Sequence, residues 1–277
     1  MLTQHAKAAA FQALHRGPGP FLLPNVWDAG GARLLSPLGF AALGTTSAGV
    51  AFALGRPDQG RVSRDEMLAA IGAIAAATPL PVTADLEAGY GATPAAVAET
   101  VGLAIAAGAV GCNLEDGSGD ATQPLVPLEQ MLASLRAARA AADASGLPFV
   151  LNARTDGFWA GGSGEAVLAE AIRRGRAYAA AGADCVFIPL LREPDGIRRA
   201  VAEIPAPLNL LFLAGGPTLK DYGALGVRRL STGGALARAA LGELRRVAAA
   251  LLASGEAGAL AGALPHAELQ RLFAEQP

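Results

Sequence analysis

Short apolar runs alternate with longer, alanine-rich segments through most of the chain. Near-continuous apolar runs are typical of strands that are buried on both faces of a parallel sheet, and the segments between them are long enough for helices. The runs predict strands at 21–27, 41–47, 81–87, 111–115, 149–155, 185–189, 208–213 and 228–232. The intervening segments predict helices at 29–35, 63–77, 93–107, 127–145, 165–181, 193–204, 218–225 and 234–253.

Eight strand–helix units in series predict an α/β protein with the (β/α)8 TIM-barrel fold. We expect residues 1–277 to form one domain, because no change of composition marks a linker. A helical extension follows from about residue 254, with a short helix over 265–273 that we place at a subunit contact. A doubly wound open sheet is the alternative. That fold usually has a glycine-rich GxGxxG turn after its first strand, and none follows residues 21–27.

Composition narrows the possible partners and locations. Hydrophobic residues make up 52% of the 277 residues, enough for a large core, and the net charge of −2 gives no basic field to attract nucleic acid. The longest apolar stretches, such as 101–110, are shorter than the ~20 residues that span a bilayer, so we expect no membrane partner. The start of the chain has no signal-peptide pattern, which predicts a cytoplasmic protein. Cys112 and Cys185 lie in apolar runs and are expected to be buried hydrophobes.

Polar residues gather where five successive predicted strands end, which is the end at which barrel enzymes build their active sites. Burying charge is costly unless it is paired or bound to metal, so a ring of acids with one arginine predicts a cation and an anionic ligand. The residues concerned are Asp28, Thr46, Ser47, Asp85, Glu87, Asn113, Glu115, Asp116, Asn152, Arg154 and Asp156.

The pair Asp85 and Glu87 is the most informative part of this ring. Alternate residues of a strand share a face, and two carboxylates beside an open, glycine-containing loop suit a hard cation such as Mg²⁺ or Mn²⁺. A buried or solvated acidic pair that caps the next helix is the alternative. No histidine falls at a strand end, which argues against a histidine-rich zinc site and against histidine as the general base.

Several of these acidic residues could instead have ordinary structural roles. Asp28 and Asp116 are equally suited to capping helices, Asp156 to pairing with Arg154, and Asp58 to an ordinary turn. The loops after the last two strands contain Gly215 and Gly234, and many barrels bind phosphate with these two loops. A phosphate site there remains a competing hypothesis.

Six segments together resemble the isocitrate lyase/phosphoenolpyruvate mutase superfamily, in order and in spacing, over nearly the whole chain. They are 25–29, 46–49, 55–58, 84–91, 113–116 and 152–156. The resemblance implies a barrel that binds Mg²⁺ (or Mn²⁺) and a small 2-oxo or dicarboxylic acid, handled as an enolate. It also implies a homodimer or homotetramer in which the last barrel helix is exchanged between subunits.

The resemblance further implies roles for individual residues. Asp85 would bind the metal directly, and Asp58, Glu87 and Glu115 would hold metal-bound waters. Arg154 would pair with the ligand carboxylate, and with Glu115 it belongs to the expected catalytic set. The remaining residues expected to contact the substrate are Thr46, Ser47, Ala48, Asn113 and Asn209.

One loop departs from the superfamily pattern. Lyases of the superfamily carry a Lys-Arg-Cys-Gly type loop after the fourth strand, and phosphonomutases carry a loop with Lys and Asn. Residues 117–125 contain no Cys, Lys or Asn, and Asp120 is their only ionisable group, so we predict Asp120 as a proton donor on a mobile lid. The expected reactions are decarboxylation or hydrolysis of an oxaloacetate- or 2-oxoglutarate-like acid, or lyase action on an unusual hydroxy diacid. Phosphonate or phosphoenolpyruvate chemistry and binding without turnover are the alternatives.

Overall fold

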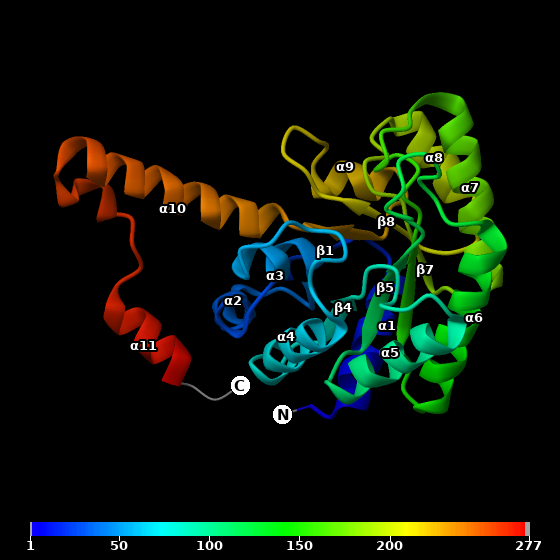
Figure 1. The fold of residues 1–277 in the computed structure, drawn as a ribbon, viewed down its shortest axis with the longest axis horizontal. Coiled ribbons are helices and arrows are strands. Elements are labelled where there is room, and N and C mark those ends of the chain that lie inside the picture. The colour runs from blue at the N-terminus through cyan, green and yellow to red at the C-terminus, as the bar shows by residue number, and fades with distance from the viewer. Residues whose placement is uncertain (1, 275–277) are drawn as a thin grey trace.

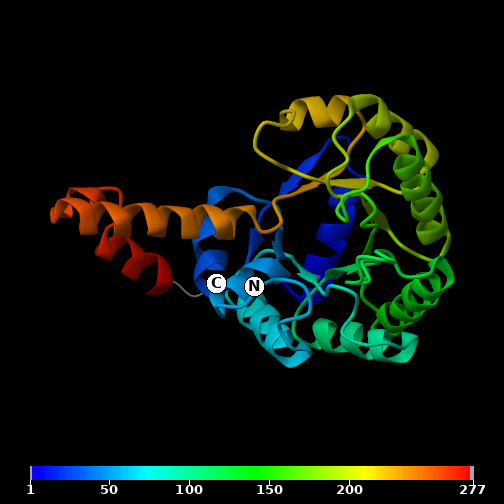
Figure 2. The ribbon, with the colours of Figure 1, turned by 45° about the horizontal axis from the view of Figure 1, so that its top comes forward.

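The computed structural model describes residues 2–274 and places parallel strands in a nearly closed barrel surrounded by helices (Figures 1 and 2). The strands are β1 (Phe21–Leu23), β2 (Asn25–Val26), β3 (Leu43–Thr45), β4 (Val82–Asp85), β5 (Gly111–Glu115), β6 (Val150–Arg154), β7 (Cys185–Phe187), β8 (Leu208–Leu211) and β9 (Arg229–Ser231). The helices are α1 (Gln4–Arg16), α2 (Ala29–Leu35), α3 (Ser47–Ala53), α4 (Arg64–Ala76), α5 (Pro94–Ala106), α6 (Leu128–Ala144), α7 (Gly164–Ala180), α8 (Pro194–Glu203), α9 (Leu219–Ala224), α10 (Ala235–Ser254) and α11 (His266–Ala274), with short 3-10 helices η1 (Ser36–Leu38) and η2 (Ala257–Leu260).

The barrel closes through a first strand that is broken in two. The strand order is β1-β9-β8-β7-β6-β5-β4-β3-β2, with every neighbouring pair parallel, so β1 holds one edge and β2 the other. Pro24 separates them, because it has no N–H to donate and offers only its carbonyl, which accepts from the Gly44 amide at 2.9 Å. The predicted barrel is confirmed, whereas the single first strand predicted over 21–27 is two strands.

Most of the other predicted strands extend too far at their carboxyl ends, whereas the strand predicted over 111–115 matches β5 at both ends. The strand predicted over 41–47 ends at Thr45, and Ser47 instead begins α3, with the Thr46 side chain accepting from the Gly49 amide at 3.3 Å. The strand predicted over 81–87 ends at Asp85, and Glu87 has a φ of 48°. Asp85 and Glu87 therefore do not share a strand face as predicted, because the chain has left the strand before Glu87.

Helix α1, which we did not predict, closes the amino-terminal mouth of the barrel. Figure 2 shows it lying across the middle of the ring of helices. Phe11 and Ala8 of α1 pack in a cluster with Leu23 of β1, with Val110, which directly precedes β5, and with Val150, which begins β6. The mouth opposite the polar strand ends is thus filled with apolar side chains.

Helix α10, the eighth barrel helix, does not cover its own barrel. Both ribbon views show it projecting away from the other helices, with η2 and α11 turning back from its far end (Figures 1 and 2). Of its residues only Ala237 is buried, while Leu241, Leu244 and Leu252 are exposed. The helix predicted over 265–273 is present as α11. Within residues 2–274, no helix is both long enough and apolar enough to cross a bilayer.

Candidate active site

A cavity of about 590 Å³ opens at the carboxyl ends of the strands. Seven of the residues predicted from the sequence line it together: Thr46, Ser47, Ala48, Asp58, Asp85, Asn113 and Arg154. They come from β4, β5 and β6 and from the segment between β3 and α4, which includes the start of α3. Because all strands are parallel, their carboxyl ends meet at one rim, which is why residues far apart in sequence converge there.

Asp85, the last residue of β4, presents an unpaired carboxylate oxygen. Its Oδ2 accepts from the Ser47 amide at 2.9 Å, and its own amide donates to Thr45 Oγ1 at 2.8 Å. Its Oδ1 is buried and has no hydrogen-bond partner among the described residues. An orphaned carboxylate oxygen beside a cavity fits a hard cation, which would supply the missing partner.

Two further acids flank Asp85. Glu87 Oε2 accepts from the Gly60 amide at 2.7 Å, and Glu87 Oε1 accepts from the Tyr90 hydroxyl at 3.0 Å. Burial raises the pKa of Asp58 and of Glu87, and the charge of Asp85 raises both further. A nearby cation would offset this repulsion.

The acids do not form a preassembled cage. Among residues 2–274, no three carboxylate, imidazole or thiolate groups lie close enough to hold a metal ion directly. An ion here would take one or two carboxylates and complete its coordination with water. That is the way Mg²⁺ usually binds, so the donor set fits Mg²⁺ better than zinc.

Arg154 is the last residue of β6, and its guanidinium group contacts two carboxylates and two aromatic rings. Its Nε and Nη2 donate to Asp156 at 2.5 and 3.1 Å, and its Nη1 pairs with Glu115 Oε2 at 2.9 Å. The rings of Trp159 and Phe187 lie 5.1 and 5.7 Å from its guanidinium carbon. Burial opposes its charge, but Glu115 and Asp156 raise the pKa of Arg154 above its ordinary value. A fixed positive charge thus stands beside Asp85, and the pairing of Asp156 with Arg154 that we considered is present.

Glu115, the last residue of β5, is the carboxyl group best placed to carry a proton. Burial raises the pKa of Glu115, although Arg154 beside it lowers that pKa. A carboxyl group with a raised pKa holds its proton at a higher pH than an exposed carboxyl group does.

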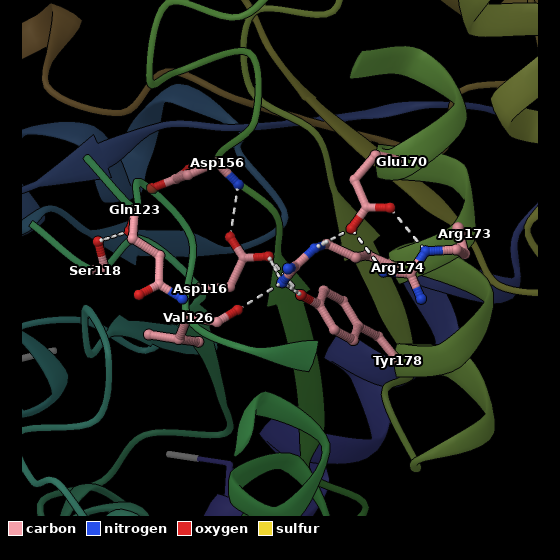
Figure 3. A network of polar contacts seen from close by, with 9 residues as sticks. All are labelled: Asp116, Ser118, Gln123, Val126, Asp156, Glu170, Arg173, Arg174 and Tyr178. Carbon is pink, nitrogen blue, oxygen red and sulfur yellow. Dashed lines mark hydrogen bonds and ion pairs between the residues drawn. The ribbon is translucent and has the colours of Figure 1, made fainter. Parts of the chain in front are cut away.

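Asp116 anchors the loop that carries Asp156, and Figure 3 shows its contacts. The buried carboxylate accepts from the Asp156 amide at 2.8 Å, from the Tyr178 hydroxyl at 2.5 Å and from Arg174 Nη1 at 3.0 Å. Arg174 also donates to Glu170 at 2.7 Å. Asp116 is therefore neither a helix cap nor a cavity residue. It joins β5, the β6–α7 loop and α7, and so fixes the position of Arg154 through Asp156.

Asp28, the other acid with two readings, caps a helix. Its Oδ1 accepts from the Gly31 amide at 2.6 Å at the start of α2.

A second polar layer lies beneath the cavity floor. Asn113 Oδ1 accepts from Asn152 Nδ2 at 2.6 Å and from Arg229 Nη2 at 3.4 Å. Asn209 is fully buried, accepts from the Ser231 hydroxyl at 3.1 Å and does not line the cavity. Burial lowers the pKa of Arg229 to about 10. Our sequence reasoning missed Arg229, although a charged residue inside an apolar strand was the available signal.

Asp120 is not brought to the other predicted residues. It is exposed in the 117–125 loop, does not line the cavity, and accepts from the Thr122 amide and hydroxyl at 2.8 and 2.7 Å. These hydrogen bonds lower the pKa of Asp120. The loop closes on itself through Ser118, whose amide donates to Pro124 and whose hydroxyl donates to Gln123.

Apart from Gly234, which we considered for a phosphate site, the rest of the lining was not predicted from the sequence. It includes Phe187, Leu190, Leu211 and Leu213 around the ends of β7 and β8, and two exposed arginines, Arg192 and Arg238. Gly233 and Gly234 also line this cavity, whereas Gly215 lines an adjoining hollow.

Comparison with known proteins decides the family. The model of the phosphoenolpyruvate phosphomutase family matches residues 11–252. The chain belongs to this family. It is 37% identical over 264 residues to an uncharacterized protein of Mycobacterium tuberculosis, covering 94% of this chain and 95% of the relative. It is 32% identical to the 2-methylisocitrate lyase of Salmonella typhimurium, over 76% of this chain and 72% of the relative.

Solved structures of this family share the fold over almost the whole chain. A Burkholderia cenocepacia protein described as a lyase or mutase superposes with a TM-score of 0.93 at 43% identity, covering 98% of this chain and 97% of that one. Oxaloacetate acetylhydrolase bound to 3,3-difluorooxalacetate gives 0.85 at 31% identity, covering 97% and 93%. Phosphonopyruvate hydrolase bound to oxalate and Mg²⁺ gives 0.84 at 30% identity, covering 97% and 95%. The resemblance to the isocitrate lyase/phosphoenolpyruvate mutase superfamily is confirmed, and the chain is an enzyme of that type.

Proposed function

We propose that this phosphomutase-family protein binds Mg²⁺ (or Mn²⁺) at Asp85 and a small 2-oxo or dicarboxylic acid beside it. The acid would react through an enolate, in a carbon–carbon lyase, decarboxylase or hydrolase reaction. The observation that carries the proposal is the buried, unpartnered Oδ1 of Asp85 at a cavity that also contains Arg154. The Mg²⁺ and oxalate bound by phosphonopyruvate hydrolase support it.

Separate sets of residues would bind the metal ion and the carboxylic acid. Asp85 would bind the cation, and Asp58, Glu87 and Glu115 would hold its waters. When bound, the cation supplies Lewis-acid stabilisation of the developing enolate charge. Arg154 offers a permanent positive charge to the ligand carboxylate. Thr46, Ser47 and Ala48 also line the cavity, and their hydroxyl or amide groups would donate hydrogen bonds to the same carboxylate. Asn113 would complete the substrate contacts, with Asn209 beneath it.

Proton transfer is the step with two candidates. Glu115 contacts Arg154 and has a raised pKa, so it can hold a proton near the ligand. Asp120 is exposed and its pKa is lowered, so it would act only after the 117–125 loop has moved over the cavity.

Oxaloacetate-like acids are the substrates that we favour. The 117–125 loop lacks the cysteine of the lyases, and the relatives include the oxaloacetate decarboxylase of Chromohalobacter salexigens, 30% identical over 86% of this chain and 83% of the relative. Phosphonate chemistry is the second candidate, because Gly233 and Gly234 line the same cavity and could present their amides to a phosphonate.

The deciding experiment is titration calorimetry of oxalate with and without Mg²⁺. We expect Asp85→Asn to weaken the Mg²⁺-dependent affinity for oxalate. The loss should exceed the roughly 10–100-fold that is typical when a residue that only supports a metal ligand is replaced. Asp65→Asn, an exposed acid of α4, is the matched control and should bind like the parent. Parental binding by a folded Asp85→Asn protein would place the metal elsewhere. NMR detection of pyruvate or acetate formed from oxaloacetate then separates decarboxylation from hydrolysis.

A further inference from the structure

The active-site cavity has two chemically different halves. The half built from β4, β5 and β6 contributes Asp85, Asn113 and Arg154. The half around the ends of β7 and β8 contributes Phe187, Leu190, Leu211 and Leu213. We call these four side chains the apolar wall. The polar half suffices for a charged head group, so the apolar wall needs a separate explanation.

The three leucines of the apolar wall are open to the cavity, whereas Phe187 is almost fully buried. Leu190, Leu211 and Leu213 are only half-buried, although core leucines such as Leu210 are fully buried. Trp159, on the loop after β6, also lines the cavity and is 41% exposed. Apolar surface that is open to a concave site is stabilised when a ligand with an apolar part covers it.

The backbone holds this wall in place under strain. Leu190 has a φ of 63°, a left-handed conformation that is costly for a leucine and is maintained only where the surroundings impose it. Gly233 leaves room for Leu211, because a Cβ at Gly233 would lie 3.1 Å from Leu211 Cδ2. Strained residues cluster at binding sites, so this local geometry supports a binding role for the wall.

The cavity is also larger than the head group needs. Its volume of about 590 Å³ lies within the range of sites for drug-sized ligands. An oxalate-like head group between Asp85 and Arg154 would fill only part of it. Arg192 and Arg238 are exposed and line the same cavity, and Arg192 also lines an adjoining hollow together with the three leucines of the apolar wall.

We propose that the preferred ligand is an oxaloacetate-like 2-oxo acid whose C3 also carries an apolar, extended or branched aliphatic group. This inference rests on the proposed function, because the polar half must hold the 2-oxo acid head group. The aliphatic group lies against Leu190, Leu211 and Leu213. Leu211, the last residue of β8, is the specificity-determining residue.

The test is calorimetry with Mg²⁺ and a series of acids that differ only in the aliphatic group: pyruvate, 2-oxobutanoate, 2-oxopentanoate and 4-methyl-2-oxopentanoate. One methylene in an apolar pocket changes recognition by about 10–200-fold, so affinity should rise at least ~10-fold from the first acid to the last. Leu211→Asn, which keeps the size but adds a polar amide, should remove this rise, because the amide does not favour hydrocarbon. Leu103→Asn, at an exposed leucine of α5 outside the cavity, should keep the rise.

The outcomes separate the two proposals. A flat or falling series, with oxalate still bound in the presence of Mg²⁺, overturns the apolar preference and leaves the proposed function intact. If the parent protein does not bind oxalate in the presence of Mg²⁺, the proposed function is overturned instead. A folded Leu211→Asn protein that keeps the full rise overturns the role of Leu211. If thermal unfolding shows that Leu211→Asn does not fold, Leu213→Asn repeats the test on the same wall.

Discussion

Arg154 shows how much of a binding site a single side chain can organise. It joins Glu115 and Asp156 and lies between the rings of Trp159 and Phe187. A ligand carboxylate must therefore compete with carboxylates that the protein already provides. The planar guanidinium suits this exchange, because its several N–H groups can be shared among partners.

Replacement of Arg154 by lysine tests this role. Lysine keeps the charge but cannot form the two-pronged contact, so Arg154→Lys should weaken Mg²⁺-dependent oxalate binding by about 1.5–3 kcal/mol, measured by calorimetry. Arg173→Lys, at an exposed arginine of α7, is the control. Unchanged affinity in Arg154→Lys would remove Arg154 from the anion site.

His15 predicts a pH dependence that is independent of the active site. It is buried, its Nδ1 donates to the Phe11 carbonyl at 2.9 Å, and burial together with the charge of Arg229 lowers its pKa to about 3. The unfolded chain binds a proton below about pH 6.5 and the folded chain does not, so stability should fall as the pH drops from 6.5 towards 3. The contribution of His15 should approach about 1.4 kcal/mol per pH unit.

Urea unfolding at several pH values measures this slope. His15→Phe, which preserves the edge-on ring packing against Phe11 and Phe21, should flatten the slope. His5→Phe, at an exposed position of the same helix, should not. Equal slopes for the parent and His15→Phe would contradict the prediction.

For individual residues, the sequence predicted the polar side chains at strand ends but not the apolar side chains that line the cavity. Asp58 was assigned to the site only through the resemblance to the superfamily, whereas Asp85 and Arg154 could be predicted to meet at the cavity because parallel strands bring their ends together. Leu211 and Leu213 could not, because a leucine that lines a cavity has the same sequence pattern as a leucine in the core.

The elements around the cavity are tied together by the contacts of Asp116. These contacts join the end of β5 to α7 and to the loop after β6 (Figure 3). Arg174→Ala would leave the carboxylate of Asp116 buried with only neutral hydrogen-bond partners. It should therefore lower the free energy of unfolding by about 3–5 kcal/mol. Arg173→Ala, on the same helix and also paired with Glu170 but exposed, should change it by less than about 0.5 kcal/mol in the same urea titration. Similar losses for both variants would show that Arg174 contributes only its surface ion pair.

The 117–125 loop predicts a missing activity. Because it carries neither Cys nor Lys, the protein should not release glyoxylate from isocitrate, or pyruvate from 2-methylisocitrate, at the ~10 s⁻¹ typical of enzymes. Product release with Mg²⁺ can be followed by NMR, with oxaloacetate as the comparison. Rapid cleavage of either tricarboxylic acid would require an acid–base residue outside this loop.

Helices could be predicted more accurately than strands. The helix over 29–35 matches α2 at both ends, and the helices predicted from 63 and 93 begin at the residues whose side chains cap α4 and α5, Ser63 and Thr93. Strand ends were overestimated, because the apolar run continues into the loop that forms the site. Helix α3 was not predicted, because its short apolar sequence resembles the end of a strand. Helix α1 was not predicted either, because its apolar side chains are buried only against the barrel that it closes.

At the scale of the whole molecule, α10 is the feature that a single chain leaves incomplete. We propose that it packs against a second copy, as the superfamily resemblance implies, in a homodimer or homotetramer. Leu244 and Leu252 are 66% and 89% exposed on this helix. Leu244→Glu with Leu252→Glu should shift the mass measured by light scattering to that of a monomer, because burying a charge in an apolar contact is costly. Arg245→Gln, at an exposed neighbouring position, should leave the mass unchanged.

The junction between the cavity and α10 has a thermodynamic consequence. Gly233 and Gly234 line the cavity and directly precede α10, so the same few peptide units belong both to the ligand's surroundings and to the base of the projecting helix. If assembly alters the direction of α10, it alters the affinity of the cavity. Ligand must then alter the association constant of the subunits by the same factor, because binding free energies around a closed cycle are reciprocal. A dilution series with and without oxalate and Mg²⁺ would measure that factor from the assembly side, without any assay of turnover.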